Sequence, residues 1–222
     1  MPAKTNRPPR DAVRHPVFAR CYARMSVISD QRAGTAAHRA ELLAGLSGRV
    51  AEIGAGNGRN FAHYPDTVTE VVAVEPERTM RQLAAEEALG VKANIDVLPG
   101  TAEELPLADS SCDAAVTSLV LCSLPDVKRA LREIARVLRP GGELRFYEHG
   151  VAEGRPGLAA VQRAVDATVW PRLFGGCHTS REPLADIEGA GFTELEFRRV
   201  RVPEGGPALP HAFHVLGRAR RP

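Results

Sequence analysis

The 222-residue sequence has few lysines and no excess of charge of either sign. Lysine occurs only at positions 4, 92 and 128, and the 29 basic residues are balanced by 27 acidic ones, which leaves a formal net charge of +2. Proteins that bind nucleic acid usually carry a clear excess of basic residues. The composition therefore gives no support to a nucleic-acid partner, and we expect none.

The sequence also lacks closely paired cysteines and a long apolar run. Its four cysteines, Cys21, Cys112, Cys122 and Cys177, include no Cys-x-x-Cys pair, so their spacing indicates neither a metal site nor a disulfide framework. The longest apolar stretch, residues 114–124, is too short to cross a bilayer. Free thiols are typical of a reducing compartment. We therefore predict a soluble cytoplasmic protein with no stable membrane insertion and no bound metal.

Length and composition indicate one folded domain. Hydrophobic residues make up 44% and charged residues 25% of the chain, close to the values of soluble globular proteins. At roughly 150 residues per domain, the length favours one domain over two. Residues 1–16 are rich in proline and arginine, and we predict a disordered basic tail there. Residues 17–222 then form the single domain.

Short β-rich runs alternate with helical segments along this domain. Residues 17–46 have the apolar spacing of two helices. The predicted strands after them are residues 49–53, 70–74, 94–98, 114–119, 143–148, 193–200 and 212–218, and the predicted helices are 59–63, 77–89, 126–138, 158–172 and 181–190. Such alternation produces right-handed strand–helix–strand units. We therefore predict an α/β fold with a doubly wound, mostly parallel sheet and two N-terminal helices.

A glycine-rich turn follows the first predicted strand, in the run Glu52-Ile53-Gly54-Ala55-Gly56-Asn57-Gly58. Glycine lets the backbone approach a ligand at the carboxyl end of a strand in such a sheet. The spacing is not the Gly-x-Gly-x-x-Gly of a dinucleotide site, and Glu52 would repel a pyrophosphate. Glu52 suits a cationic amino-acid group or an ordered amide network instead. By itself, however, the turn is as typical of a plain tight turn as of a site.

Residues at the ends of the next strands extend this pattern. Glu75, followed by Pro76, ends the second strand, where a carboxylate can accept both hydroxyls of a ribose. Residues 101–103 follow the third strand and can offer a backbone N–H and a side chain to an adenine edge. Ser118 and Leu119 end the fourth strand, beside the reactive end of such a ligand. Each residue alone has an ordinary structural explanation, but their joint occurrence at successive strand ends favours one ligand site.

In this order, the motifs resemble those of the class I S-adenosylmethionine-dependent methyltransferases, with residues 133–142 as a further shared run. The resemblance implies a seven-stranded sheet with a reversed last hairpin, and S-adenosylmethionine as the cofactor. It also implies that Glu75 holds the ribose while the glycine-rich turn receives the methionine part. The cofactor-binding residues predicted in this way are Tyr22, Glu52, Gly54, Ala55, Gly56, Asn60, Glu75, Pro76, Thr101, Ala102, Glu103, Ser118 and Leu119.

Four further segments give a closer likeness, which covers roughly residues 15–202. Residues 60–65, 118–123, 146–149 and 175–182 are similar to those of a methyltransferase-like family whose animal members are microsomal alkyl-thiol S-methyltransferases. Those animal proteins begin with a hydrophobic anchoring segment, whereas this chain begins with a basic tail, so membrane attachment does not carry over. The resemblance implies methyl transfer to a small apolar acceptor, first of all a thiol.

Two histidines are the candidate catalytic residues. His149 ends the fifth predicted strand and His178 follows Cys177 in a glycine-rich loop, and an imidazole titrates in the range a general base needs. A thiol with a pKa of about 8.5 is partly ionised at pH 7 and can react without a base. The sequence leaves open O- or N-methylation of a small metabolite or lipid head group, a non-catalytic cofactor-binding regulatory module, and the oligomeric state.

Overall fold

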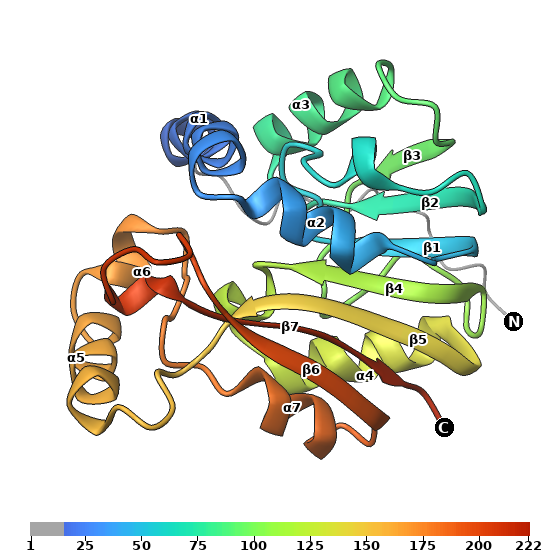
Figure 1. The fold of residues 1–222 in the computed structure, drawn as a ribbon. Coiled ribbons are helices and arrows are strands. Elements are labelled where there is room, and N and C mark those ends of the chain that lie inside the picture. The colour runs from blue at the N-terminus through green and yellow to red at the C-terminus, as the bar shows by residue number, and fades with distance from the viewer. Residues whose placement is uncertain (1–15) are drawn as a thin grey trace, which may run out of the picture.

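The computed structural model describes residues 16–222, which form a seven-stranded sheet with helices on both faces (Figure 1). The strand order is β3-β2-β1-β4-β5-β7-β6. The predicted tail lies outside the described residues, apart from Pro16, which begins the first helix. The strands are β1 (Gly48–Ile53), β2 (Val68–Val74), β3 (Ile95–Leu98), β4 (Cys112–Ser118), β5 (Leu138–His149), β6 (Thr193–Arg201) and β7 (Phe213–Arg220).

Seven α-helices connect and cover these strands within residues 16–222. They are α1 (Pro16–Arg32), α2 (Thr35–Leu43), α3 (Arg78–Ala88), α4 (Val127–Val137), α5 (Pro156–Asp166), α6 (Trp170–Leu173) and α7 (Pro183–Gly189), together with the short 3-10 helices η1 (Phe61–His63), η2 (Leu121–Ser123) and η3 (Pro210–Ala212). The two predicted N-terminal helices are confirmed as α1 and α2. No helix in this part of the chain has the length and apolar character needed to cross a membrane.

The pairing of the strands confirms the predicted sheet. β1 to β5 run parallel to one another, whereas β7 is antiparallel to both β5 and β6. The order reverses at β1, because the chain moves outward to β2 and β3 and then returns to β4 on the other side of β1. In doubly wound sheets, ligands bind outside the carboxyl ends of the strands at such a reversal.

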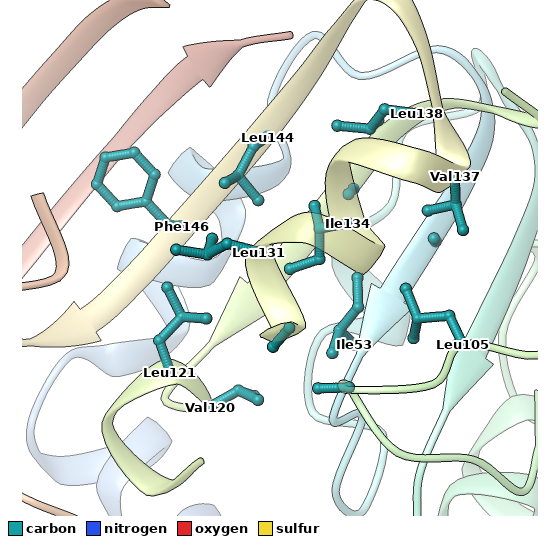
Figure 2. Close-up of a cluster of buried hydrophobic side chains, with 14 of the residues drawn as sticks. Ile53, Leu105, Val120, Leu121, Leu131, Ile134, Val137, Leu138, Leu144 and Phe146 are labelled. Atoms are coloured by element: carbon teal, nitrogen blue, oxygen red, sulfur yellow. The ribbon is translucent and has the colours of Figure 1, made fainter. Parts of the chain in front are cut away.

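The core consists of two buried layers, one on each face of the sheet. Alternate residues of each strand point to opposite faces, so in β2 Val72 belongs to one layer and Val71 to the other. On the first face α4 buries residues with the spacing i, i+3, i+4 and i+7, and its N-terminus is capped by Asp126, which accepts a hydrogen bond from the Arg129 N–H. Figure 2 shows Leu131 and Ile134 of α4 packed among the strand residues of this layer.

Two predicted elements differ most clearly from the structure, beyond shifts of a few residues at the ends of others. The predicted helix 158–172 is divided into α5 and α6. Pro171 lacks a backbone N–H and its ring crowds the preceding turn, so a continuous helix through it is unfavourable. The predicted strand 143–148 begins earlier, at Leu138, because residues 139–142 form an irregular start to β5. Gly141, with φ +77°, lies within this irregular start.

Candidate active site

The carboxyl ends of the parallel strands gather at one edge of the sheet, where the predicted site residues follow them. In Figure 1 the arrowheads of the central strands point toward the side on which α1, α5 and α6 lie. The turn after β1, the residues after β2 and β3, and the segment after β4 all reach this edge. The structure thus brings the predicted cofactor residues to one side of the sheet.

The glycine-rich turn leaves β1 and is held against β2. The backbone N–H groups of Gly54 and Ala55 donate to the carbonyl of Val74 at 2.8 and 3.2 Å. Gly54 has φ +67°, and a Cβ there would lie 2.6 Å from a methyl group of Val120. A Cβ on Gly56, with φ +57°, would instead project into open space. The turn therefore presents bare backbone to a volume in which a ligand can lie.

Glu75 lies directly beside this turn. One carboxylate oxygen accepts the Gly56 N–H at 2.9 Å and the other accepts the Glu77 N–H at 2.8 Å, across the intervening Pro76. Burial raises the pKa of Glu75, and the two backbone hydrogen bonds act against that rise. Because a carboxylate oxygen can accept more than one hydrogen bond, both oxygens keep capacity for ligand hydroxyls.

The segment after β3 forms a tight turn. Thr101 pairs with Glu104 across it, and Ala102 is buried. One carboxylate oxygen of Glu103 is buried and accepts no hydrogen bond from the described residues. A buried acceptor without a donor costs about 1–3 kcal/mol. A ligand that supplies an N–H group here, as an adenine does, would remove that cost, so these residues fit the predicted cofactor.

Glu52 lies beneath the turn as part of a polar network. Its two oxygens accept from the Asn60 side-chain amide at 3.0 Å and from the Tyr64 hydroxyl at 2.8 Å. Burial raises the pKa of Glu52 to about 7, although both hydrogen bonds and the charge of Arg39 oppose the rise. Of the two roles that the sequence left open for Glu52, the ordered amide network is the one seen in the structure.

Arg39 of α2 links this network to the rest of the site, and no motif in the sequence indicated it. Its guanidinium donates to Asn60 at 2.9 Å, to Ser118 Oγ at 3.0 Å and to Asp30 at 3.1 Å, and the side chain is buried. Next to Ser118, Leu119 has φ +61°, which is unusual for a residue with a side chain. The end of β4 is thus held by a charged group from a distant helix.

Helix α1 is fastened over the turn by polar contacts. Ser26 donates to the Asn57 side chain at 3.2 Å, and Arg59 donates to Asp30 at 2.7 Å. Tyr22 lies one turn before Ser26 on this helix, and burial raises its pKa to about 12. The charge of Arg39 lowers the same pKa, whereas Cys122, Cys177 and Glu148 raise it.

A cluster of Cys122, His149 and Cys177, called the sulfur cluster below, lies at the same edge of the sheet. Sγ of Cys177 is 3.7 Å from Sγ of Cys122 and 3.4 Å from Nδ1 of His149. The hydrogen bond between the two thiols, and then the contact with His149, lower the pKa of the Cys177 thiol, whereas the same bond raises that of Cys122. Sequence spacing could not reveal this cluster, because 55 residues separate its two cysteines.

The other predicted histidine lies next to the cluster but outside it. The His178 backbone N–H donates to the carbonyl of Cys122 at 2.8 Å, and its Nδ1 is buried without a partner among the described residues. Glu148, which the sequence did not single out as a site residue, accepts the N–H groups of Val120 and Cys122. Burial raises the pKa of Glu148 to about 7. The segment after β4 is thus held by hydrogen bonds to its backbone from two residues, His178 and Glu148.

Comparisons with known proteins agree with this geometry. Residues 51–146 match the family model described as a methyltransferase domain. The chain is 37% identical over 183 residues to the thiol S-methyltransferase TMT1B of Homo sapiens. This alignment covers 80% of this chain and 73% of that protein. It is also 33% identical over 183 residues to the ubiquinone/menaquinone biosynthesis C-methyltransferase UbiE of Syntrophotalea carbinolica, covering 78% of this chain and 75% of that protein.

Solved structures show the same fold. A possible histamine N-methyltransferase from Thermotoga maritima, described as S-adenosylmethionine-dependent, superimposes with a TM-score of 0.68 at 24% identity and covers 93% of this chain and 97% of its own. The predicted fold, cofactor and resemblance are thereby confirmed. The chain belongs to the class I S-adenosylmethionine-dependent methyltransferases, in the group that includes the thiol S-methyltransferases.

Proposed function

We propose that this enzyme transfers the methyl group of S-adenosylmethionine to the sulfur of a small apolar thiol. The observation that carries the proposal is the 37% identity to a thiol S-methyltransferase over 183 residues, nearly twice the length of the methyltransferase-domain match at residues 51–146. The shared sequence therefore extends well beyond the segments that bind the cofactor. The acceptor is a small molecule and not a nucleic acid, in keeping with the balanced charge of the chain.

The cofactor residues have proposed roles within this reaction. Glu75 would hold the ribose, because it keeps free acceptor capacity on both oxygens beside the glycine-rich turn. The bare backbone at Gly56 would receive the methionine part, and the unpaired oxygen of Glu103 would accept a hydrogen bond from the adenine. Ser118 and Leu119 would then lie nearest the reactive end.

The chemistry demands little of the protein beyond positioning. S-adenosylmethionine supplies an electrophilic methyl group on a sulfonium, and the enzyme has to hold a nucleophile in line at about 3 Å from it. A thiol with a pKa of about 8.5 is already partly ionised at pH 7. His149 and His178 are the proposed groups for orienting or deprotonating the acceptor. Tyr22 and the sulfur cluster are the proposed neighbours of the acceptor.

Mass spectrometry of the products tests the proposal. The purified protein is incubated with S-adenosylmethionine and a mixed panel of apolar thiols, amines, phenols and a quinol, with a matched reaction that lacks the cofactor as control. We expect a mass gain of one methyl group on the thiols. Methylation confined to nitrogen, oxygen or carbon acceptors would overturn the thiol assignment.

The same preparation decides between an enzyme and a regulatory module. Cofactor affinity is measured by calorimetry alongside the product assay, since both alternatives retain the cofactor residues. Tight binding of S-adenosylmethionine without any methylated product would favour the module. In the enzyme, His149→Ala should lower turnover more than cofactor affinity, and unchanged turnover would remove His149 from the reaction.

We also propose that the enzyme works in the cytoplasm, where its four free cysteines stay reduced.

A further inference from the structure

The two distances from Cys177 to the other members of the sulfur cluster match those between ligands of one metal ion. Tetrahedral zinc, with bonds of about 2.3 Å to sulfur and about 2.0–2.1 Å to nitrogen, separates two sulfur ligands by about 3.8 Å and a sulfur from a nitrogen by about 3.5 Å. The observed separations are 3.7 Å between the sulfurs of Cys122 and Cys177 and 3.4 Å between Cys177 Sγ and His149 Nδ1. All three ligand atoms lie within 4.8 Å of one another.

The backbone around the cluster brings its two cysteines together. The segment with Cys177 reaches the segment with Cys122 because Gly176 has no side chain: a Cβ there would lie 2.9 Å from the carbonyl oxygen of Ser123. The two segments are then joined by the hydrogen bond from the His178 N–H to the Cys122 carbonyl. The positions of the two sulfur atoms therefore follow from rigid backbone contacts.

The imidazole of the cluster is held in place as well. The ring of His149 lies against that of His214, with ring centres 4.4 Å apart and planes 33° apart. His149 directs Nδ1 toward Cys177, and the residue is half-buried. A partly exposed ligand gives an ion a route into the site, which a closed pocket of three buried residues would lack.

Burial and charge favour a divalent ion at this position. Cys122 and Cys177 are only 1% and 7% exposed. With an ion bound, both cysteines would be thiolates, and a divalent cation would balance the two negative charges that they and a neutral imidazole carry. Two thiolates and one imidazole form a soft donor set that zinc prefers over magnesium or calcium.

We propose that Cys122, His149 and Cys177 form a three-ligand site for a thiophilic divalent cation of the zinc type, with a fourth coordination position that takes the sulfur of the acceptor. Three protein ligands and one open position are the usual arrangement of catalytic zinc. The part of this inference that concerns the acceptor rests on the proposed thiol methylation.

Such an ion would also do the work of a base, and His149 would then orient the acceptor through the ion instead of deprotonating it. An acceptor thiol R–SH that coordinates the ion releases its proton to solvent, since coordinated thiols are deprotonated. The thiolate sulfur then forms the new bond to the methyl carbon while the bond from that carbon to the sulfonium breaks. The products are R–S–CH₃ and S-adenosylhomocysteine. Cys122 follows β4, His149 ends β5, and Cys177 lies in the loop after α6. The ion would therefore lie on the acceptor side of the sheet edge.

Metal analysis of the reduced protein tests the site itself. The protein is incubated with zinc, desalted, and analysed by elemental mass spectrometry for wild type, Cys122→Ser, Cys177→Ser and His149→Ala. Cys112→Ser is the matched control, because Cys112 is equally buried but lies outside the cluster. We expect one zinc per chain in wild type and in the control, and at least a tenfold weaker affinity in each ligand variant.

Circular dichroism separates loss of the ion from loss of the fold. If a serine variant unfolds, the measurement is repeated with His149→Ala and Cys122→Ala. Substoichiometric zinc in the reduced wild type, or equal zinc in wild type and all folded cluster variants, would overturn the proposal. A disulfide between Cys122 and Cys177 in a protein that takes up no zinc after reduction would assign the pair to redox chemistry instead.

Cobalt substitution tests the open position without any measurement of activity. Cobalt(II) bound by two thiolates gives a charge-transfer band in the near ultraviolet and visible bands that depend on the full ligand set. We expect an apolar thiol to shift the visible bands of the cobalt protein, and the corresponding alcohol to leave them unchanged. Visible bands that do not respond to the thiol would overturn the acceptor role. If no thiol is methylated, the thiol proposal fails, while zinc content and cobalt spectra still decide whether the site exists.

Discussion

The two halves of the active site are assembled in different ways. On the cofactor side, interacting groups are close along the chain: Glu52 and Asn60 are 8 residues apart, and Gly56 and Glu75 are 19 apart. On the acceptor side, 55 residues separate Cys122 from Cys177, and 28 separate His149 from Cys177. The difference shows why a cofactor site can be identified from short motifs, whereas an acceptor site depends on how remote elements pack.

Arg39 is the point at which the two halves join, so its removal should have the largest effect on them. Arg39→Met would leave the buried carboxylate of Asp30 without one of its two arginine partners and Ser118 without its donor. Breaking a buried ion pair in this way costs about 3–5 kcal/mol. Urea denaturation should show this loss in the free energy of unfolding. Arg32→Met, an exposed residue at the end of α1, serves as control, and an equal effect of both changes would contradict a joining role for Arg39.

Glu52 gives a pH test that concerns the cofactor side alone. Its pKa in the folded state is about 7, above the value of 4.5 for the free side chain, so the folded protein holds the proton more tightly. Its contribution to stability is therefore complete below about pH 4.5 and is lost as the pH rises toward 7, by about 3 kcal/mol at about 1.4 kcal/mol per pKa unit.

The variant Glu52→Gln has no carboxyl group to ionise at this position. Its free energy of unfolding, measured by denaturation at several values between pH 5 and pH 8, should consequently fall less steeply with pH than that of the wild type. Parallel curves for the two proteins would show that Glu52 titrates normally. The part of the pH dependence of stability that comes from groups on the acceptor side should be the same in both proteins.

Glu75 tests whether the cofactor half works as its motifs predict. Glu75→Gln keeps the shape of the side chain but removes the charge that accepts hydroxyl donors, and hydrogen bonds to charged groups contribute about 1.5–3 kcal/mol. We expect S-adenosylhomocysteine to bind roughly 10- to 100-fold more weakly by calorimetry. Glu86→Gln, on the exposed face of α3, should bind it like the wild type. Unchanged affinity in Glu75→Gln would contradict the ribose assignment.

Gly176 gives the smallest and most local test of the acceptor side. Gly176→Ala and Gly154→Ala both place a side chain on a glycine of positive φ, +89° and +71°, but only the first side chain would meet another atom, the carbonyl oxygen of Ser123. The strain of the backbone is thus common to both variants. Gly176→Ala should be the less stable of the two by about 1 kcal/mol in thermal unfolding. Equal stability would mean that the two cysteine segments can separate at no cost.

Much of the fold could be predicted because its signals are local. The apolar spacing of residues 127–137 predicted α4, and the alternation of strands and helices predicted a mostly parallel sheet. The irregular start of β5 and the break between α5 and α6 were missed. The first depends on contacts with another strand, and Pro171 marks the second, although the apolar pattern continues through it.

The residues of the site also divide into those with a local signal in the sequence and those that depend on distant contacts. Glu75 and the glycine-rich turn were found in the sequence because both directly follow strands. Arg39 was missed because a helical arginine is ordinarily a solvated residue, and only the packing of α2 shows it to be buried. The sulfur cluster was missed because the expectation of no metal site rested on spacing along the chain. His149 and His178 were found as neighbours of the acceptor, but their roles stay predictions.

The position of β7 affects how the chain can fold during synthesis. β7 lies between β5 and β6, although it follows both of them in the sequence. When a ribosome has released the chain only as far as β6, the edge of β5 has no partner, and β6 has no strand against which to pair. A nascent chain at that stage exposes two open strand edges, which favour aggregation. Residues 213–220 therefore complete the sheet at its interior, and a chaperone that shields β5 would protect the protein until they emerge.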